Sequence, residues 1–243
     1  MPKMVKAGLK FFKKTLSGAK IKDVRRRAKL LILELDNNYT LVIHLKMSGQ
    51  LIYNGQKTKH MHLIYHFTDG SKLIHNDLRQ FGYVKLIPAD KLEELLEEKE
   101  KYGPEPLNKD FTLKIFEGLL KKYPKKRIKP LLMDQTFLAG IGNLYADEIL
   151  FASSVLPTRP VGRIKLAEAK KIYQNIKKIL TLAIKYRGTS ADLYIDAQGK
   201  KGNFLSKLKV YQREGQKCFR CGAIIKRIKI NSRSAFFCPR CQK

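Results

Sequence analysis

The sequence predicts an α+β protein built from several domains, and three observations lead to this fold class. Apolar residues alternate with polar ones in the first hundred residues, whereas residues 111–186 carry them at helical spacing. All four cysteines lie in the last 26 residues and define a small third unit. The chain has 243 residues, of which 44% are hydrophobic, so it can bury more than one core and is not generally disordered.

Strand signals dominate the first domain. Residues 41–47 and 61–67 alternate with period two, which predicts half-buried strands, and Asp69-Gly70 predicts a tight turn before residues 72–75. From Pro88 to Lys101 the leucine spacing becomes helical. The following Gly103-Pro104-Glu105-Pro106 cannot continue a helix. We therefore place the first domain at residues 1–102.

Helical spacing defines the second domain. Four segments show it: residues 111–122, 126–134, 143–153 and 165–186. A glycine-rich turn, residues 139–143, precedes the third of these helices, and Asn143 suits its N-cap position. Residues 187–209 are polar and glycine-rich, which indicates a loop. The second domain is therefore expected to span residues 103–209.

The charge of the chain indicates an anionic partner. Lys and Arg number 50 against 21 acidic residues, a net charge of +29, and residues 1–29 and 199–243 are the most basic segments. Nucleic acid is the commonest partner for such charge, although a cationic protein of a membrane surface would also fit. No apolar run is long enough to cross a bilayer and no secretory signal is visible, so we expect a soluble, cytoplasmic protein.

The glycine turn before Asn143 is a candidate phosphate site. Glycines let backbone N–H groups approach a phosphate, the next helix adds its dipole, and Lys125 with its basic neighbours lies just upstream. An ordinary connection inside a helical bundle would explain the glycines equally well. Met47, Phe81 and Arg233 are ambiguous in the same way, since they suit either packing and solvation or contacts with DNA.

The cysteines predict a zinc site. Cys218-x2-Cys221 and Cys238-x2-Cys241 form two pairs separated by sixteen residues, and four thiolates at this spacing can surround one tetrahedral Zn²⁺. Two disulfides are the alternative, but nothing in the chain suggests secretion. Four protein ligands leave no position for a reactive water, so the metal is expected to be structural. The third domain, residues 210–243, is expected to be a β-hairpin zinc finger.

Several motifs occur together, in one order, in a known family. The sequence resembles the formamidopyrimidine-DNA glycosylases, bacterial base-excision repair enzymes that remove oxidised purines and nick the abasic strand. The match runs from about Phe12 to Lys243. It is carried by Arg26-Arg27-Ala28-Lys29, His44-Leu45-Lys46-Met47-Ser48-Gly49, Asp77-Leu78-Arg79-Gln80-Phe81-Gly82, Gly103-Pro104-Glu105-Pro106-Leu107, Lys129-Pro130-Leu131-Leu132-Met133-Asp134-Gln135, Gly140-Ile141-Gly142-Asn143-Leu144-Tyr145-Ala146-Asp147-Glu148, Val210-Tyr211 and the four cysteines.

The resemblance implies a fold and a set of site residues. It implies a β-sandwich domain, a helix–two-turns–helix domain and a zinc finger, with double-stranded DNA containing damaged or abasic sites held across a cleft. Lys29 would contact phosphate near the lesion and assist elimination. Met47, Arg79 and Phe81 would fill the gap left by a flipped nucleotide. The other implied DNA contacts are His60, Lys125, Asn143 and Arg233, and the loop 188–204 would cover the flipped base.

The sequence departs from the family at its amino terminus. The family's N-terminal proline forms a Schiff base with the sugar, and an adjacent glutamate moves protons. Here Met1-Pro2-Lys3-Met4 opens the chain, with Lys3 in the place of the glutamate and only 28 residues before Lys29. We therefore expect an N-terminally incomplete sandwich domain, with Pro2 an incidental residue on a mobile basic segment and not the nucleophile.

Three classes of function remain open from the sequence. The first is a DNA glycosylase with lyase activity, and the second is a damaged-DNA-binding protein that has lost its catalytic residues. A zinc-ribbon RNA-binding protein is the third, and the ordered matches at Met47, Arg79, Phe81 and Asn143 argue against it. A monomer is the expected oligomeric state.

Overall fold

The computed structural model describes residues 4–56, 58–99, 101–189 and 194–243. The chain divides into two compact units. Unit 1 comprises Met1–Lys101 and Tyr186–Leu205, and unit 2 comprises Tyr102–Lys185 and Ser206–Lys243. Each unit is described by itself below.

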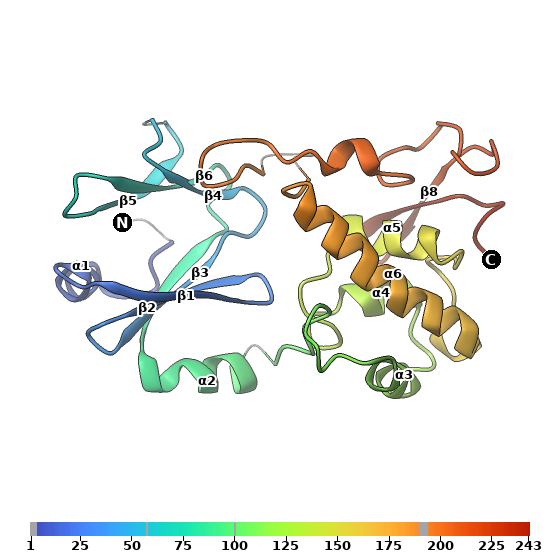
Figure 1. The fold of residues 1–243 in the computed structure, drawn as a ribbon, viewed down its shortest axis with the longest axis horizontal. Helices are drawn as coiled ribbons and strands as arrows, with labels where there is room; N and C mark the ends of the chain where they lie inside the picture. Colours follow the sequence, from blue (N-terminus) through green and yellow to red (C-terminus); the bar gives the residue numbers. More distant parts are fainter. Residues whose placement is uncertain (1–3, 57, 100, 190–193) are drawn as a thin grey trace. The chain divides into compact units, whose positions relative to one another are not determined.

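Unit 1 is a sandwich of two antiparallel sheets (Figure 1). One sheet has the order β1-β2-β3-β7 and the other has the order β4-β6-β5. The strands are β1 (Ile21–Arg27), β2 (Leu30–Leu35), β3 (Tyr39–His44), β4 (Gly49–Tyr53), β5 (Met61–His66), β6 (Lys72–Asp77) and β7 (Tyr83–Pro88). The strands expected from residues 41–47, 61–67 and 72–75 are present, and the turn at Asp69-Gly70 joins the last two.

Strand β3 departs from the expected half-buried pattern, because both of its faces are covered. Leu41 and Ile43 pack in the core between the sheets, while Thr40 and Val42 are also fully buried. The strand ends at His44, and Lys46 follows with a left-handed backbone (φ 51°). The alternation of residues 41–47 therefore runs past the strand, and Met47 lies in the turn to β4.

Helical segments flank the sheets of unit 1. The first helix, α1 (Leu9–Leu16), buries Phe12 in the sandwich core. The helix expected from Pro88 to Lys101 is observed as a continuous helical segment that changes pitch. It consists of a 3-10 turn (Ala89–Lys91), α2 (Leu92–Glu94) and a π turn (Leu95–Lys99).

The described chain begins as part of the fold. Val5 pairs with Val84 of β7 in a parallel bridge, and the Met4 carbonyl accepts a hydrogen bond from the Val84 N–H at 2.8 Å. The Met4 side chain is 2% exposed and belongs to the sandwich core. The expectation of a mobile basic segment is therefore wrong from Met4 onward, because burial and backbone pairing fix these residues against β7.

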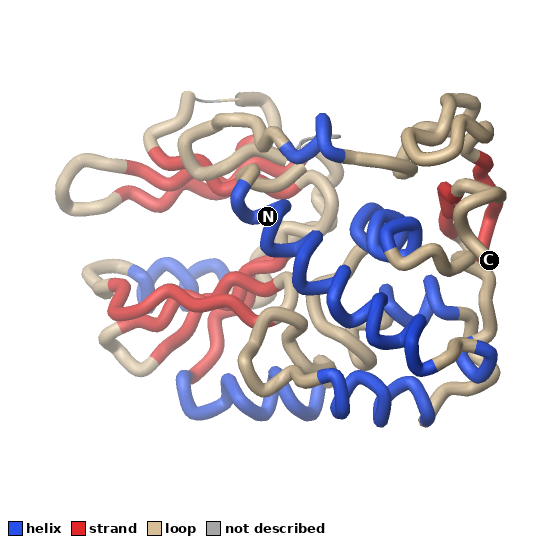
Figure 2. Tube along the Cα trace, turned by 45° about the vertical axis from the view of Figure 1, so that its right-hand side comes forward, coloured by secondary structure: helices blue, strands red, loops and turns tan. Residues whose placement is uncertain are grey.

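Unit 2 has a helical core and a β-hairpin (Figure 2). The four predicted helices are confirmed, each slightly shorter than its sequence pattern: α3 (Leu113–Lys121), α4 (Ile128–Met133), α5 (Asn143–Ala152) and α6 (Leu166–Lys185). Their core contains Phe111, Phe116 and Phe137, all 1% exposed or less. The hairpin consists of β8 (Lys226–Ile230) and β9 (Arg233–Phe237), joined by a two-residue turn.

The remaining segments are short helical turns and one ordered loop. Two 3-10 turns lie at Val161–Arg163 and Phe204–Lys207. In the loop of unit 1, Asp196 pairs with Arg187 and caps the turn to Lys200, and the Ala197 carbonyl accepts a hydrogen bond from the Tyr53 N–H at 2.8 Å. No helix among the described residues is long and apolar enough to cross a membrane.

Candidate functional site

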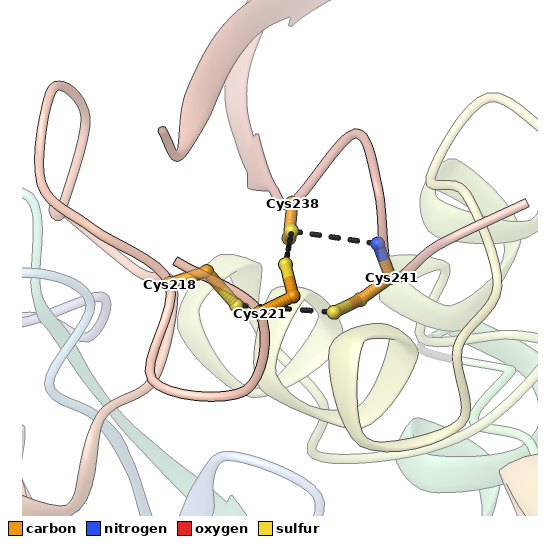
Figure 3. Close-up of side chains that lie close together, drawn as sticks. All are labelled: Cys218, Cys221, Cys238 and Cys241. Carbon is orange, nitrogen blue, oxygen red and sulfur yellow. Dashed lines mark hydrogen bonds between the residues drawn. The ribbon is translucent and has the colours of Figure 1, made fainter. Parts of the chain in front are cut away.

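The four cysteines converge on one point in unit 2 (Figure 3). Their sulfur atoms lie within 4.8 Å of one another, with Cys218 Sγ 3.9 Å from Cys241 Sγ and Cys221 Sγ 3.5 Å from Cys238 Sγ. A tetrahedral Zn²⁺ with Zn–S bonds of about 2.3 Å needs sulfurs about 3.8 Å apart. The donor set therefore fits one zinc ion, and all four positions are filled by protein, as a structural site requires.

Backbone N–H groups of the two knuckles support the sulfurs. The N–H of Arg220 points to Cys218 Sγ and that of Cys241 points to Cys238 Sγ, each at 3.4 Å. Burial acts to raise the pKa of the Cys218 thiol, but hydrogen bonds from the N–H groups of Arg220 and Cys221 and from the neighbouring thiols outweigh it and bring the pKa to about 7. Such contacts orient the ligands and favour the thiolate that a metal binds.

A buried ion pair joins the hairpin to the helices of unit 2. Lys129 on α4 and Asp147 on α5 are 1% exposed each, with Lys129 Nζ 2.7 Å from Asp147 Oδ1. Lys129 also donates to the Ser234 carbonyl at 2.6 Å, and Asp147 Oδ2 accepts from the Phe236 N–H at 3.1 Å. Both charged groups thus reach strand β9, which fixes the hairpin against two helices.

Burial controls the protonation of this pair. It raises the pKa of Asp147 to about 7, although the Lys129 ammonium and the Phe236 N–H act in the opposite direction. Burial likewise lowers the pKa of Lys129, against the attraction of Asp147. The native fold therefore holds a proton on Asp147 more tightly than the unfolded chain does.

Glu148, the next residue on α5, holds the segment that leads into the finger. Its carboxylate accepts backbone N–H groups from Lys209, Val210 and Tyr211 at 2.9–3.0 Å. Glu148 is 4% exposed, and these hydrogen bonds replace the water that its charge has lost. Two consecutive carboxylates of α5 therefore fix both the entry to the finger and its hairpin.

Arg233 lies in the hairpin, close to Lys129 of the buried pair. It is the first residue of β9, is exposed, and follows the two-residue turn in which Asn231 adopts a left-handed backbone (φ 53°). A cavity of about 210 Å³ opens beside it, lined by the hairpin turn and by α4 residues such as Lys129 and Met133. Arg233 therefore lies at an exposed position of the hairpin, as the sequence predicts.

The glycine turn before α5 caps the helix with a different residue from the one the sequence predicts. The sequence predicts Asn143 as N-cap, but Gly142 occupies that position and Asn143 is the first helical residue. Asn143 Oδ1 is buried without a hydrogen-bond partner in the described structure. Gly140 adopts φ 86°, which favours glycine, but its N–H donates to Gln135 Oε1 at 2.9 Å and so is already used within the turn.

Gln135 organises this turn. Its amide donates to the carbonyls of Met133 and Ile141, both at 2.9 Å, while its oxygen accepts the Gly140 N–H. One side chain thereby bridges the end of α4 and the start of α5. The predicted Lys125 is exposed in the turn between α3 and α4, and no contact in the described structure brings it to Asn143.

In unit 1, three of the predicted residues meet at two adjacent turns. Arg79 Nη1 lies 3.4 Å from Met47 Sδ, and its guanidinium carbon lies 4.8 Å from the centre of the Phe81 ring. Met47 and Phe81 are 67% and 57% exposed, unusually high for large apolar side chains. The β3–β4 turn and the β6–β7 turn therefore present a compact exposed group, Met47, Arg79 and Phe81, which we call the wedge.

Lys29 and His60 lie near the same end of the sandwich. Lys29 is exposed in the tight turn between β1 and β2, and the next residue, Leu30, pairs with His44 close to the wedge turn. His60 is half-buried, and its carbonyl accepts the Asp77 N–H at 2.9 Å. Pro2, the remaining predicted residue, lies outside the described residues, as does Lys3.

The exposed cations, the wedge and the zinc hairpin together suit a protein that binds DNA. Family models match the formamidopyrimidine-DNA glycosylase N-terminal domain at residues 2–84 and its H2TH domain at residues 102–194. A third model, the zinc finger found in FPG and IleRS, matches residues 215–243.

Named relatives agree over the whole chain. The formamidopyrimidine-DNA glycosylase of Pelotomaculum thermopropionicum is 41% identical, covering 100% of this chain and 89% of the relative. That of Heliobacterium modesticaldum is 42% identical over 96% of this chain and 85% of the relative. A Lactococcus lactis Fpg structure in complex with DNA containing an abasic site superposes with a TM-score of 0.92 at 38% identity, covering 100% and 89% of the two chains.

The chain belongs to the formamidopyrimidine-DNA glycosylase family. It is a DNA glycosylase of base-excision repair with one structural zinc ion, and DNA is its partner. The predicted fold class, the enzyme class and the zinc site are confirmed. The comparisons give no support to the alternative of a binding protein that has lost its chemistry.

Sequence reasoning missed the residues that hold the site residues in place. Asp77, Gln135, Asp147 and Glu148 all lie inside the motifs that carry the family resemblance, yet none received a role. One signal in the sequence could have identified them. Each is an acid or an amide that stands next to a glycine turn or among apolar residues of a helix, in a chain that is otherwise rich in basic residues. Such a group needs buried partners, which only the fold identifies.

Removal of one zinc ligand tests the metal site. Cys221→Ser is expected to lose the zinc and, with it, tight DNA binding, because the hairpin that carries Arg233 depends on the metal. Elemental analysis of purified protein should find one zinc per chain in the parent and in the exposed hairpin control Ser232→Ala. An unchanged zinc content in Cys221→Ser would contradict the assignment.

The pH dependence of stability tests the Lys129–Asp147 pair. Because burial raises the pKa of Asp147 to about 7, its contribution to stability is present at low pH and is lost as pH rises from about 4 through 7. The free energy of unfolding should therefore fall between pH 6 and pH 8 by on the order of 1 kcal/mol more than in Asp147→Asn. Denaturant titrations at both pH values measure this difference. An equal change in the free energy of unfolding between pH 6 and pH 8 in the two proteins would refute the prediction.

Proposed function

We propose that this glycosylase acts on oxidised purines in double-stranded DNA and then cleaves the strand at the abasic site. Two observations on relatives support this substrate. One Lactococcus lactis structure similar to the chain holds DNA with Fapy-dG, and another holds DNA with an abasic site. The observation that carries the proposal in this chain is the wedge, because exposed apolar side chains beside an arginine are suited to enter a base stack.

The wedge residues have separate tasks in this proposal. Met47 and Phe81 fill the space that the flipped nucleotide leaves, which offsets part of the lost stacking. Arg79 lies between them and can donate hydrogen bonds to the base opposite the lesion. Its stacking on Phe81 keeps the guanidinium plane in place for this contact.

The other predicted residues bind the DNA backbone in this proposal. Asn143, at the first turn of α5, and Arg233, at the hairpin turn, grip the phosphates that flank the lesion. His60 and Lys125 add contacts to the backbone, while Lys29 contacts phosphate near the lesion and assists elimination. The loop 188–204 covers the extruded base. Residues 190–193 of this loop lie outside the described structure.

An amine carries out the chemistry. Its nitrogen attacks the sugar C1′, the bond to the damaged base breaks, and an iminium Schiff base forms. The iminium acidifies the C2′ proton, and loss of this proton expels the 3′ phosphate and nicks the strand. Within residues 1–243, Pro2 offers a secondary amine if Met1 is removed, but the adjacent Lys3 offers no carboxylate for proton transfer, so we propose that any Schiff base formed by these residues comes from a lysine amine.

The assembly and location follow from the same proposal. A single wedge and a single phosphate-binding hairpin suffice for one lesion, so the chain is proposed to act as a monomer. Its net charge of +29 favours a place on the nucleoid in the cytoplasm, where non-specific contacts with DNA precede the search for lesions.

Alanine variants separate the wedge from the phosphate contacts. Asn143→Ala and Arg233→Ala should weaken binding to damaged and plain duplex alike, and Arg233→Ala should reduce the salt slope by about one. Met47→Ala and Phe81→Ala should weaken binding to damaged or abasic duplex more than to plain duplex, because only there is a base flipped. Fluorescence anisotropy at several salt concentrations measures both, and equal losses on both duplexes for all four variants would disprove the wedge.

Reductive trapping identifies the amine. Borohydride should capture a covalent adduct of the protein with abasic DNA, and peptide mapping should place it on a lysine and not on Pro2. The position of the adduct in the peptide map distinguishes a lysine from Pro2. Efficient adduct formation on Pro2 would overturn this assignment and leave the rest of the proposal intact.

A further inference from the structure

Asp77 gathers several donors around one buried carboxylate at the base of the wedge. The residue is 1% exposed. Its Oδ1 accepts the Ser48 hydroxyl at 2.5 Å and lies 3.3 Å from the Arg79 N–H, while Oδ2 accepts the Gly82 N–H at 2.7 Å. Ser48 Oγ accepts the Arg79 N–H in turn, at 3.0 Å. Every donor in this network belongs to one of the two turns that carry the wedge.

The two turns approach each other too closely for ordinary side chains. A Cβ added to Gly82 would lie 2.9 Å from Asp77 Oδ2 and 3.1 Å from the His44 carbonyl oxygen. A Cβ added to Gly49 would lie 2.5 Å from the Leu45 carbonyl oxygen, within the turn that presents Met47. Gly82 thus makes room for the Asp77 carboxylate, and Gly49 lets the turn that carries Met47 close tightly on Leu45.

The backbone of Asp77 extends the network to a third segment. Its N–H donates to the His60 carbonyl at 2.9 Å, and its own carbonyl lies 3.0 Å from His62 Nε2. Asp77 therefore contacts both turns that carry the wedge and also the backbone of His60.

We propose that Asp77 is the positioning residue of the wedge: through Ser48 and the amides of Arg79 and Gly82 it holds Met47, Arg79 and Phe81 in one preformed arrangement before DNA arrives. This inference rests on the proposed function of the wedge. Its physical basis is preorganisation. An exposed methionine and phenylalanine that must first be ordered would spend part of their binding free energy on that ordering.

The chemistry of this position requires a carboxylate. An ionised Asp only accepts hydrogen bonds, and here all of its neighbours donate. Burial acts to raise the pKa of Asp77, but the hydrogen bonds from Ser48, Gly82 and Arg79 outweigh it and hold the pKa below its ordinary value. An asparagine of the same shape would place an NH₂ group against one or two of these donors.

Two variants and one matched control test the inference. Asp77→Asn and Ser48→Ala should lower the preference for abasic over plain duplex by about tenfold and threefold, while binding to plain duplex changes less than twofold. Asp69→Asn is the control, since Asp69 accepts analogous hydrogen bonds from Ser71 in the β5–β6 turn and should leave the preference unchanged. Anisotropy titrations with the two duplexes give the preference, and thermal unfolding shows whether each variant is folded.

A double-mutant cycle with Phe81→Ala shows whether Asp77 acts through the wedge. If it does, the losses of preference in Asp77→Asn and Phe81→Ala will not add in the double variant. Additive losses, or a folded Asp77→Asn with normal preference, overturn the inference while the wedge stands. An unchanged preference in Phe81→Ala itself contradicts the proposed function instead. If Asp77→Asn does not fold, the cycle with Ser48→Ala, which removes a single hydroxyl, decides in the same way.

Discussion

The zinc hairpin depends on the buried contact between Lys129 and Asp147. A hairpin of two five-residue strands buries too little apolar surface to be stable alone, and zinc supplies much of what is missing. Zinc fixes the knuckles at Cys218 and Cys241, however, and not the direction of the turn that carries Arg233. That direction comes from the helices, because Lys129 and Asp147 bind opposite groups of strand β9, the Ser234 carbonyl and the Phe236 N–H. A break in either partner would leave the other charge buried and unpaired.

Unit 1 also contains a buried carboxylate that binds backbone groups, and there it orders the wedge. Asp77 is buried at the base of the wedge and Asp147 is buried against strand β9, and each carboxylate binds backbone groups of the segment that it orders. The two differ in protonation. Asp77 receives enough hydrogen bonds to lower its pKa, whereas the burial of Asp147 outweighs its partners and raises its pKa to about 7. The balance between burial and hydrogen bonding therefore differs at the two sites, and it favours the charged form of Asp77 and the protonated form of Asp147.

Most of the fold could be predicted from the sequence, but the supporting contacts could not. Periodicity identified α3 to α6 and strands β3, β5 and β6, because the core faces of these elements are continuous. The same rule failed at Met47, where an apolar residue continues the alternation and yet lies exposed in a turn. The capping preference failed at Asn143, since Gly142 takes the N-cap position. Gln135, seven residues before that cap in the chain, bonds the Gly140 N–H of the turn instead. Spacing specified the zinc ligands fully, because four sulfurs at two short intervals leave few other arrangements.

The placement of acids explains how so basic a chain can position its DNA-binding residues. Phosphates repel carboxylates, so an exposed and unpaired acid beside the wedge or Arg233 would oppose binding. Asp134, which lines the cavity beside Arg233, is paired with Lys126 Nζ at 3.5 Å. An acid is nevertheless the strongest acceptor for backbone N–H groups, which must be bonded wherever turns pack closely. Burial of Asp77, Asp147 and Glu148 resolves this conflict, because each is at most 4% exposed and its oxygens accept hydrogen bonds from nearby donors. The surface can then remain cationic while carboxylates beneath it set the geometry.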